Sequence, residues 1–248
     1  MAFFRRDDTP LPTAPAGFLY EMHQHSARCS ACGRDDVRDV VRQLKKEGYA
    51  GMVLTNHFYH GNTALRRQQA WEDFVRPYEE DYLQAKAEGD RLDFDVLFGI
   101  EEVVGYGWKE VLVYGITPSF LYDHPELAEG GEEAEHLARL TALVHEAGGV
   151  VFQAHPFRVR DYIPRPWEEL PAELLDGVEG YNACNSPMEN ARAAAMAQQK
   201  GLLVIAGSDA HTAVQRERYG LLFDRRIRDE ATLAACLQRE EYTLYLGE

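Results

Sequence analysis

The feature that most constrains the fold of this chain is a regular alternation of short apolar runs with segments of helical periodicity. Between several of these runs, apolar residues recur every three or four positions, as a helix with one buried face requires. Strands that alternate with helices are typical of parallel strands joined by crossover helices, so the pattern predicts an α/β barrel or open sheet. The apolar runs lie at residues 18–22, 49–55, 93–100, 110–116, 150–153, 177–181 and 202–207, with two further runs at 220–223 and 242–245.

The chain is long enough for one large domain or two small ones, at 248 residues. Residues 1–17 carry three prolines and are predicted to form an irregular lead-in. No linker composition interrupts the remainder, so we expect a single domain over residues 18–248. The segment 63–88 has aromatic residues at helical intervals, and Pro77 within it is expected to kink or divide the helix.

Charge and hydropathy argue against several classes of function. The chain carries 41 acidic and 26 basic residues, for a net charge of −15. General binding to nucleic-acid phosphates needs clustered Lys and Arg, so we expect no strong binding of that kind. No apolar run approaches the roughly 18 residues of a membrane span, and the first residues lack the apolar stretch of a signal peptide. These observations predict a cytoplasmic protein with no membrane partner.

Four cysteines are too few for a disulfide framework in a chain of this length. Cys29 and Cys32 form a C-x-x-C pattern, but no second pair follows at the spacing of a zinc ribbon. We therefore interpret this pattern as a feature of a loop rather than as a separate zinc site.

Side chains that can bind a metal ion or a polar ligand follow successive apolar runs. In a barrel the carboxyl ends of the parallel strands open onto one face, where such folds place their active sites. Imidazoles and carboxylates bind zinc, manganese and iron, and more than four such ligands imply more than one ion. The residues concerned are His23, His25, Asn56, His57, Glu101, Glu102, His155, Asn182, Asp209 and His211.

Taken in order, the segments EMHQH, TNH, GIEE, AHP, YN and GSDAH resemble the motifs of the PHP (polymerase and histidinol phosphatase) domain family, over about residues 18–212. This resemblance implies a distorted (β/α)7 barrel that hydrolyses phosphoesters, with two or three divalent metal ions (Zn, Mn or Fe) at the carboxyl ends of the strands. The implied ligands are His23, His25, Glu101 and Asp209 for one ion, Glu101 and His155 for a second, and His57 and His211 for a third.

The sequence departs from the family pattern at four places. Glu21 and Asn56 stand where the family usually has aspartates. Residues 30–32 read Ser-Ala-Cys, so the usual aspartate ligand to the third ion is missing there. Glu110 stands where many members have a histidine ligand to the second ion, and its carboxylate remains a candidate ligand. Whether two or three ions bind is left open.

Arg158 follows His155 by three residues and is predicted to clamp a phosphate with its guanidinium fork. Arg158, His57 and Asp209 form the candidate catalytic set. The predicted function is metal-dependent hydrolysis of a small phosphomonoester, because paired ions roughly 3.5–4 Å apart activate water and clamp a phosphoryl oxygen.

Two other functions remain as alternatives. An amidohydrolase also starts its barrel with H-x-H, but it usually needs a lysine at a middle strand end, and here Lys109 precedes its strand. A binding or regulatory module that holds metal without turnover is the other alternative. Of the four remaining histidines, His60 is a candidate substrate contact, and His124, His136 and His145 are expected to be exposed to solvent.

Overall fold

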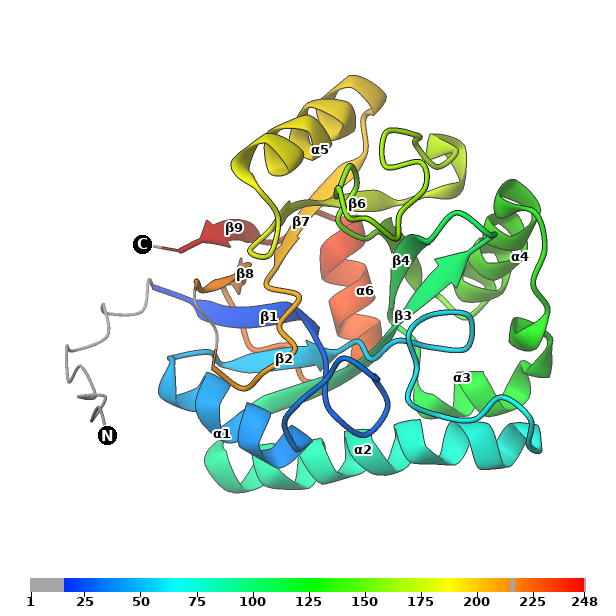
Figure 1. Cartoon of the computed structure of the whole chain (residues 1–248). Helices are drawn as coiled ribbons and strands as arrows, with labels where there is room; N and C mark the ends of the chain where they lie inside the picture. The colour runs from blue at the N-terminus through cyan, green and yellow to red at the C-terminus, as the bar shows by residue number, and fades with distance from the viewer. Residues whose placement is uncertain (1–15, 215–216, 248) are drawn as a thin grey trace, which may run out of the picture.

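The structure, a computed structural model, describes residues 16–214 and 217–247 and forms an α/β barrel (Figure 1). The lead-in expected at residues 1–17 falls almost wholly outside these residues. The sheet of the described chain has nine strands in the order β7-β6-β5-β4-β3-β2-β1-β8-β9. They are β1 (Phe18–Gln24), β2 (Gly51–Leu54), β3 (Asp95–Val104), β4 (Lys109–Tyr114), β5 (Val150–Gln153), β6 (Gly177–Asn182), β7 (Leu203–Gly207), β8 (Tyr219–Phe223) and β9 (Thr243–Leu246).

Six α-helices are assigned among the described residues, and most of them lie around the sheet (Figure 1). None of them is long and apolar enough to cross a membrane. The helices are α1 (Val37–Lys46), α2 (Trp71–Leu92), α3 (Pro118–Asp123), α4 (Glu133–Glu146), α5 (Pro187–Lys200) and α6 (Glu230–Gln238), with short 3-10 turns at Pro125–Ala128 and Ala172–Leu174.

Strands β1 to β7 close on themselves at the end of β1. The backbone N–H of His25 donates to the carbonyl of Ala210 at 3.1 Å, and the N–H of Ala210 donates to the carbonyl of His23 at 3.3 Å. The first half of β1 instead pairs antiparallel with β8. The predicted distorted barrel is therefore confirmed, with β8 and β9 added to its seven strands as an antiparallel pair whose connection contains α6.

The expectation of parallel strands throughout is wrong for β4, which runs antiparallel to both β3 and β5. Only residues 105–108 join β3 to β4, and a parallel connection needs a dozen or more residues. The pair therefore forms a hairpin. As a result the start of β4, rather than its end, lies beside the carboxyl ends of the parallel strands.

Helix α2 differs from its prediction at both its start and its middle. It begins at Trp71 rather than near residue 63, because residues 64–70 form turns and bends. Pro77 lies inside the helix and does not divide it. Only one backbone N–H is lost at Pro77, and the apolar face that includes Phe74, Tyr78 and Tyr82 is buried on both sides of it. Tertiary packing thus outweighs the local cost of the proline.

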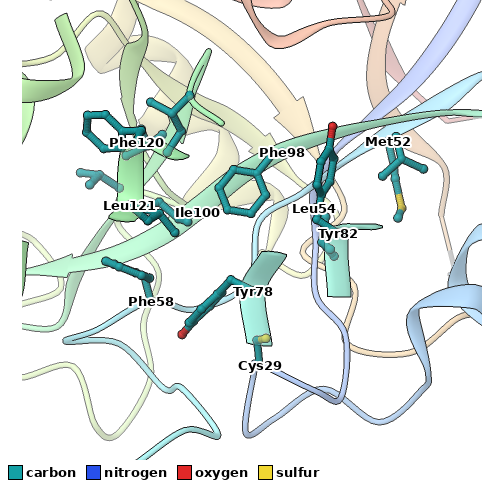
Figure 2. Packing of buried hydrophobic residues seen from close by; sticks show 14 of the residues in the cluster. Cys29, Met52, Leu54, Phe58, Tyr78, Tyr82, Phe98, Ile100, Phe120 and Leu121 are labelled. Atoms are coloured by element: carbon teal, nitrogen blue, oxygen red, sulfur yellow. The ribbon is translucent and has the colours of Figure 1, made fainter. Parts of the chain in front are cut away.

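The core has two parts, one inside the barrel and one between the strands and the outer helices. Strand β3 shows how alternation assigns residues to them, because neighbouring side chains on a strand point to opposite faces. Leu97 packs inside the barrel, where α6 covers the end opposite the predicted site. Phe98 and Ile100 pack outside, in the cluster drawn in Figure 2. The same alternation directs Glu101 into the barrel and Glu102 away from it.

Candidate metal centre

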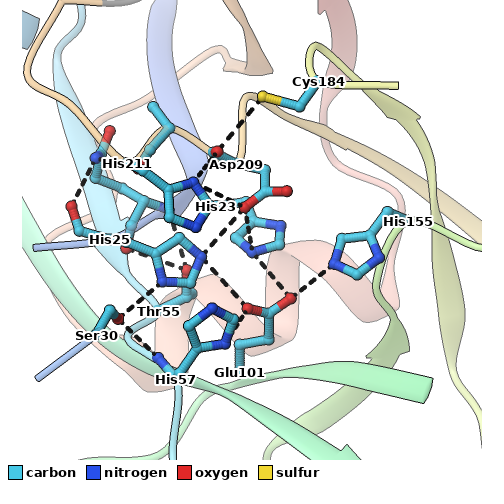
Figure 3. A network of polar contacts seen from close by, with 12 residues as sticks. His23, His25, Ser30, Thr55, His57, Glu101, His155, Cys184, Asp209 and His211 are labelled. Carbon is cyan, nitrogen blue, oxygen red and sulfur yellow. Dashed lines mark hydrogen bonds and ion pairs between the residues drawn. The ribbon is translucent and has the colours of Figure 1, made fainter. Parts of the chain in front are cut away.

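The histidines predicted at the strand ends converge on Glu101 at one end of the barrel (Figure 3). The carboxylate oxygens of Glu101 lie 3.2 Å from His23 Nε2, 3.3 Å from His25 Nε2, 2.8 Å from His57 Nδ1 and 2.9 Å from His155 Nε2. These residues come from β1, from the segment after β2, from β3 and from the segment after β5. The structure thus brings together residues that lie far apart in the sequence.

Asp209 and His211 complete the cluster from the segment after β7. Asp209 Oδ1 lies 3.5 Å from His23 Nε2 and 3.2 Å from His25 Nε2, and the His211 ring stacks on the His25 ring at 4.5 Å. Asp209 and His155 have φ angles of 54° and 29°, a region that costs free energy for residues other than glycine. Backbone strain of this kind is found mainly at functional sites, where the surrounding structure maintains it.

Several ligand atoms of the cluster are buried without a hydrogen-bond partner. They are His23 Nε2, His25 Nε2, His57 Nδ1 and Glu101 Oε2. A buried polar atom without a partner costs about 1–3 kcal/mol, and four of them beside one another indicate that an ion belongs between them. Imidazole nitrogens and carboxylate oxygens suit zinc, manganese and iron, so the residues fit the expected metals.

The predicted ligands form overlapping groups rather than one shell. In each group the ligand atoms lie within 4.8 Å of one another. His23, His25, His57 and Glu101 each belong to two of these groups, which allows more than one ion. The groups are His23–His25–Glu101, His23–His155–Asp209, His25–His57–His211 and His57–Glu101–Glu110.

The electrostatic field of the cluster favours positive charge. Burial alone would lower the pKa of His23, but Glu101, Glu179 and Asp209 outweigh it and raise this pKa well above its usual value. Burial alone would raise the pKa of Asp209, but Arg158 and His23 hold it well below its usual range. A site that stabilises a buried proton in this way will also stabilise a divalent cation.

Glu110 belongs to the cluster because β4 is antiparallel. The first residues of β4 lie at the open end of the barrel, and Glu110 shares the inward face of β4 with Leu112 and Tyr114. Its carboxylate oxygens lie 3.5 Å from His57 Nδ1 and 3.4 Å from His155 Nε2. Burial, and secondly the charge of Glu101, raise the pKa of Glu110 to about 7.

The sequence analysis missed Glu179, which orients two of the candidate ligands. Its Oε1 accepts a hydrogen bond from His23 Nδ1 at 3.0 Å, and its Oε2 accepts one from the backbone N–H of His155 at 2.9 Å. With Nδ1 donating, His23 presents a bare Nε2 to the centre. A Cβ at Gly207 would lie 2.7 Å from Glu179 Oε1, so only glycine fits there. The available signal was a single charge inside the apolar strand β6.

The guanidinium of Arg158 lies beside the cluster in a fixed orientation. Its Nη1 lies 2.6 Å from Asp209 Oδ2, its Nη2 donates to Asn182 Oδ1 at 3.0 Å, and its Nε donates to Asn185 Oδ1 at 2.8 Å. Arg158 is 8% exposed, so it is not the solvated arginine that a loop residue would ordinarily be. The structure brings it to the site, and its action on a substrate stays a prediction.

A cavity of about 370 Å³ opens onto the centre. Trp108 and Tyr162 are partly exposed where they border it, and their rings meet edge to face at 6.1 Å. Trp108 has a φ of 55°, a strained conformation at the tip of the β3–β4 hairpin. Besides these two residues, the cavity is lined by Cys32, His57, Asn62, Glu110, His155, Arg158, Asp209 and His211.

The two cysteines of the C-x-x-C pattern do not act together. Cys29 is fully buried in the outer core near Tyr78 (Figure 2), whereas Cys32 lines the cavity. Burial alone would raise the pKa of the Cys32 thiol, but hydrogen bonds with His211 and His57 outweigh it and lower the pKa to about 6. Cys32 therefore belongs to the candidate site, which the sequence analysis did not predict.

Two further expectations concern residues outside the centre. His136 is buried rather than exposed, in a second cluster with His60 and Glu102 on the outer side of β3. Lys109, the lysine weighed for an amidohydrolase, lies on the face of β4 opposite Glu110, and its Nζ donates to the carbonyl of Glu168. This orientation disfavours an amidohydrolase arrangement.

Comparison with known proteins connects this geometry to a family. A family model described as "PHP-associated" matches residues 187–242, the part of the chain that contains Asp209 and His211. A search of curated proteins finds no match. A two-domain protein from Bacteroides vulgatus that contains a predicted PHP-like metal-dependent phosphoesterase has a similar structure, with a TM-score of 0.65 and 15% identity over 99% of this chain and 70% of that chain.

Two other similar structures differ in what they are described to be. An amidohydrolase from Chromobacterium violaceum, with bound sulfate and no metal, matches with a TM-score of 0.54 and 18% identity, over 78% of this chain and 87% of that chain. The lesion-specific endonuclease PfuEndoQ from Pyrococcus furiosus matches with a TM-score of 0.58 and 12% identity, over 92% of this chain and 57% of that chain. At these identities the likeness concerns the fold. This likeness and the "PHP-associated" match both support the resemblance of the chain to the PHP domain family.

Proposed function

We propose that the protein is a metal-dependent phosphoric ester hydrolase that acts on a small phosphomonoester. The observation that carries this proposal is the set of buried, unpartnered ligand atoms on His23, His25, His57 and Glu101, beside a cavity that also presents an arginine. The cavity has room for a phosphoryl group with a small leaving group. It is lined mainly by polar and aromatic residues. A concave site of this size favours a small ligand.

The residues of the chain have separate roles in this proposal. Bound divalent ions would supply Lewis acidity, activation of water and neutralisation of phosphoryl charge. The ligand groups around Glu101 and Asp209 would hold them, and Glu179 keeps the His23 ring in the orientation that presents Nε2. Arg158 would bind non-bridging phosphoryl oxygens with its remaining N–H groups. Trp108 and Tyr162 would contact the leaving group and exclude water from the cavity mouth.

Metal analysis combined with an assay of an aryl phosphate tests the proposal. Purified protein reconstituted with Mn²⁺ or Zn²⁺ should hold at least two ions per chain and should hydrolyse the aryl phosphate. Asp209→Asn should abolish hydrolysis while the circular dichroism spectrum stays that of the folded protein, because Asp209 lies in a loop outside the hydrophobic core. Less than one ion per chain after reconstitution would overturn the proposal.

A substrate panel separates the remaining alternatives. It should include phosphomonoesters, single-stranded and damaged DNA because of the likeness to an endonuclease, and N-acyl compounds because of the likeness to an amidohydrolase. Preference for a small phosphomonoester is the expected result, given the net charge of −15 and the cavity volume of about 370 Å³. Two bound ions without turnover of any compound would instead favour a binding or regulatory module.

A further inference from the structure

The loop that carries Cys32 is fastened to the segments that carry His57 and His211. On one side of Cys32, the backbone N–H of Ala31 donates to the carbonyl of Asn62 at 2.8 Å. On the other side, the N–H of Arg34 donates to the carbonyl of His211 at 2.9 Å. Backbone hydrogen bonds on both sides of Cys32 therefore fix the position of its loop between the two segments.

The turn after Cys32 is equally constrained. A Cβ at Gly33 would lie 2.2 Å from the carbonyl oxygen of Ser26, so the backbone can pass there only as glycine. Cys32 is half-buried and lines the cavity together with His57 and His211. These constraints hold a thiol at the cavity, one residue after Ala31, where the family resemblance leads one to expect an aspartate.

The neighbouring histidines have ligand atoms to offer. His211 Nδ1 donates to the carbonyl of Asp209 at 2.9 Å, which leaves Nε2 with a free lone pair. The ligand atoms of His25, His57 and His211 lie within 4.8 Å of one another. Imidazoles and a thiol that line one cavity are a ligand set typical of zinc sites.

We propose that Cys32 is a metal ligand, and that its thiolate together with His57 and His211 binds one ion of the zinc type, Zn²⁺, Co²⁺ or Fe²⁺. The inference rests on the metal centre of the proposed function. Binding replaces the thiol proton, which passes to solvent. Three protein ligands would leave one position of such an ion for water or substrate, as in catalytic zinc sites.

The proposal predicts a difference in metal preference between the two sides of the centre. A soft thiolate selects Zn²⁺, Co²⁺ and Fe²⁺ over Mn²⁺ and Mg²⁺, whereas the carboxylate-rich side around Glu101 accepts Mn²⁺ as well. One ion per chain should therefore discriminate strongly against Mn²⁺, and that ion should depend on Cys32.

Cobalt substitution of the full-length protein tests the assignment without any measurement of activity. Protein stripped of metal and loaded with Co²⁺ should show a near-ultraviolet sulfur-to-cobalt charge-transfer band. Cys32→Ser should lose this band and bind one ion fewer per chain. Cys32→Asp should also lose the band, but it should keep the ion count and accept Mn²⁺ at that position.

Cys236→Ser is the matched control. Cys236 lies in α6, at the other end of the barrel, where Arg225 Nη2 donates to its sulfur at 3.3 Å, a contact that a serine hydroxyl can also accept. This variant should retain the charge-transfer band in full. Alkylation gives a second readout: iodoacetamide should modify Cys32 in metal-free protein, and Zn²⁺ should protect it whereas Mn²⁺ should not.

The outcomes separate this inference from the proposed function. Two or more bound cobalt ions without a charge-transfer band, or a band that persists in Cys32→Ser, would overturn the assignment of Cys32 and leave the hydrolase proposal standing. Failure to bind any ion would overturn both. Equal protection of Cys32 by Mn²⁺ and Zn²⁺ would contradict the predicted metal preference.

Discussion

Glu101 and Glu102 are neighbours on β3, and each lies in a cluster of histidines, but on opposite sides of the strand. Glu101 faces into the barrel and contacts four imidazoles. Glu102 faces outward, where its Oε1 accepts from His60 Nδ1 at 2.6 Å and from the His60 backbone N–H at 2.9 Å. The His136 ring meets the His60 ring edge to face at 4.7 Å. Residue types alone do not distinguish the two clusters.

The two clusters differ in how their lone pairs are used. Four ligand atoms of the inner cluster are buried without hydrogen bonds and lie close together. In the outer cluster His60 is paired with Glu102, and His136 Nδ1 accepts the backbone N–H of Gly105 at 3.2 Å, so that one oxygen, Glu102 Oε2, is left without a partner. The outer cluster therefore links α4 and the segment after β2 to β3. The inner cluster instead presents unused lone pairs that can bind metal ions.

The largest expected effect comes from paired substitutions on β3. Glu101→Gln should release at least one ion and reduce hydrolysis by more than the about 10–100-fold typical of residues that only support a ligand. Glu102→Gln should leave metal content and turnover unchanged, because an amide oxygen can still accept from His60. Metal analysis and steady-state kinetics on both variants check this. Loss of an ion from Glu102→Gln would make the outer cluster a metal site too.

The sequence predicts the ligands of the inner cluster because they follow strands. His23, His57, His155 and Asp209 each come directly after or at the end of an apolar run, and parallel strand ends share one face. Glu110 was found through the family resemblance, and only the antiparallel direction of β4 explains its position. Local patterns do not report strand direction when the connection is short.

Other residues could not be predicted because their surroundings are assembled by tertiary structure. Glu179 lies inside a strand and His136 inside a helix, where periodicity reports which face is buried but not which polar groups it meets. Cys32 is brought to the same cavity as His57 and His211 by backbone hydrogen bonds between three separate segments. Long-range contacts of this kind leave no pattern in the local sequence.

The second largest effect is expected at Arg158, which distinguishes substrate contact from metal support within the inner cluster. A charge-assisted hydrogen bond contributes roughly 1.5–3 kcal/mol, so Arg158→Ala should lower kcat/KM about ten- to more than a hundredfold. Arg158→Lys keeps a positive charge beside Asp209 but lacks the planar fork, so it should retain metal and recover only part of the activity. A change below about twofold in both variants would contradict the phosphate clamp.

The smallest expected effect concerns His136 and the outer cluster. Burial, and secondly the neighbouring charges of His60 and Arg139, lower the pKa of His136 to about 4. In the unfolded chain this pKa is about 6.5, so between these values the unfolded state binds more protons than the folded state. The contribution of neutral His136 to stability is therefore complete above pH 6.5 and is lost as the pH falls toward 4.

His136→Asn removes the titration of this side chain, but the asparagine can still accept the N–H of Gly105. Denaturant unfolding of metal-free protein at pH 7 and pH 4 should show that the wild type loses on the order of 2 kcal/mol more than this variant. Equal losses would mean that the outer cluster admits a charged imidazole, as the inner one does.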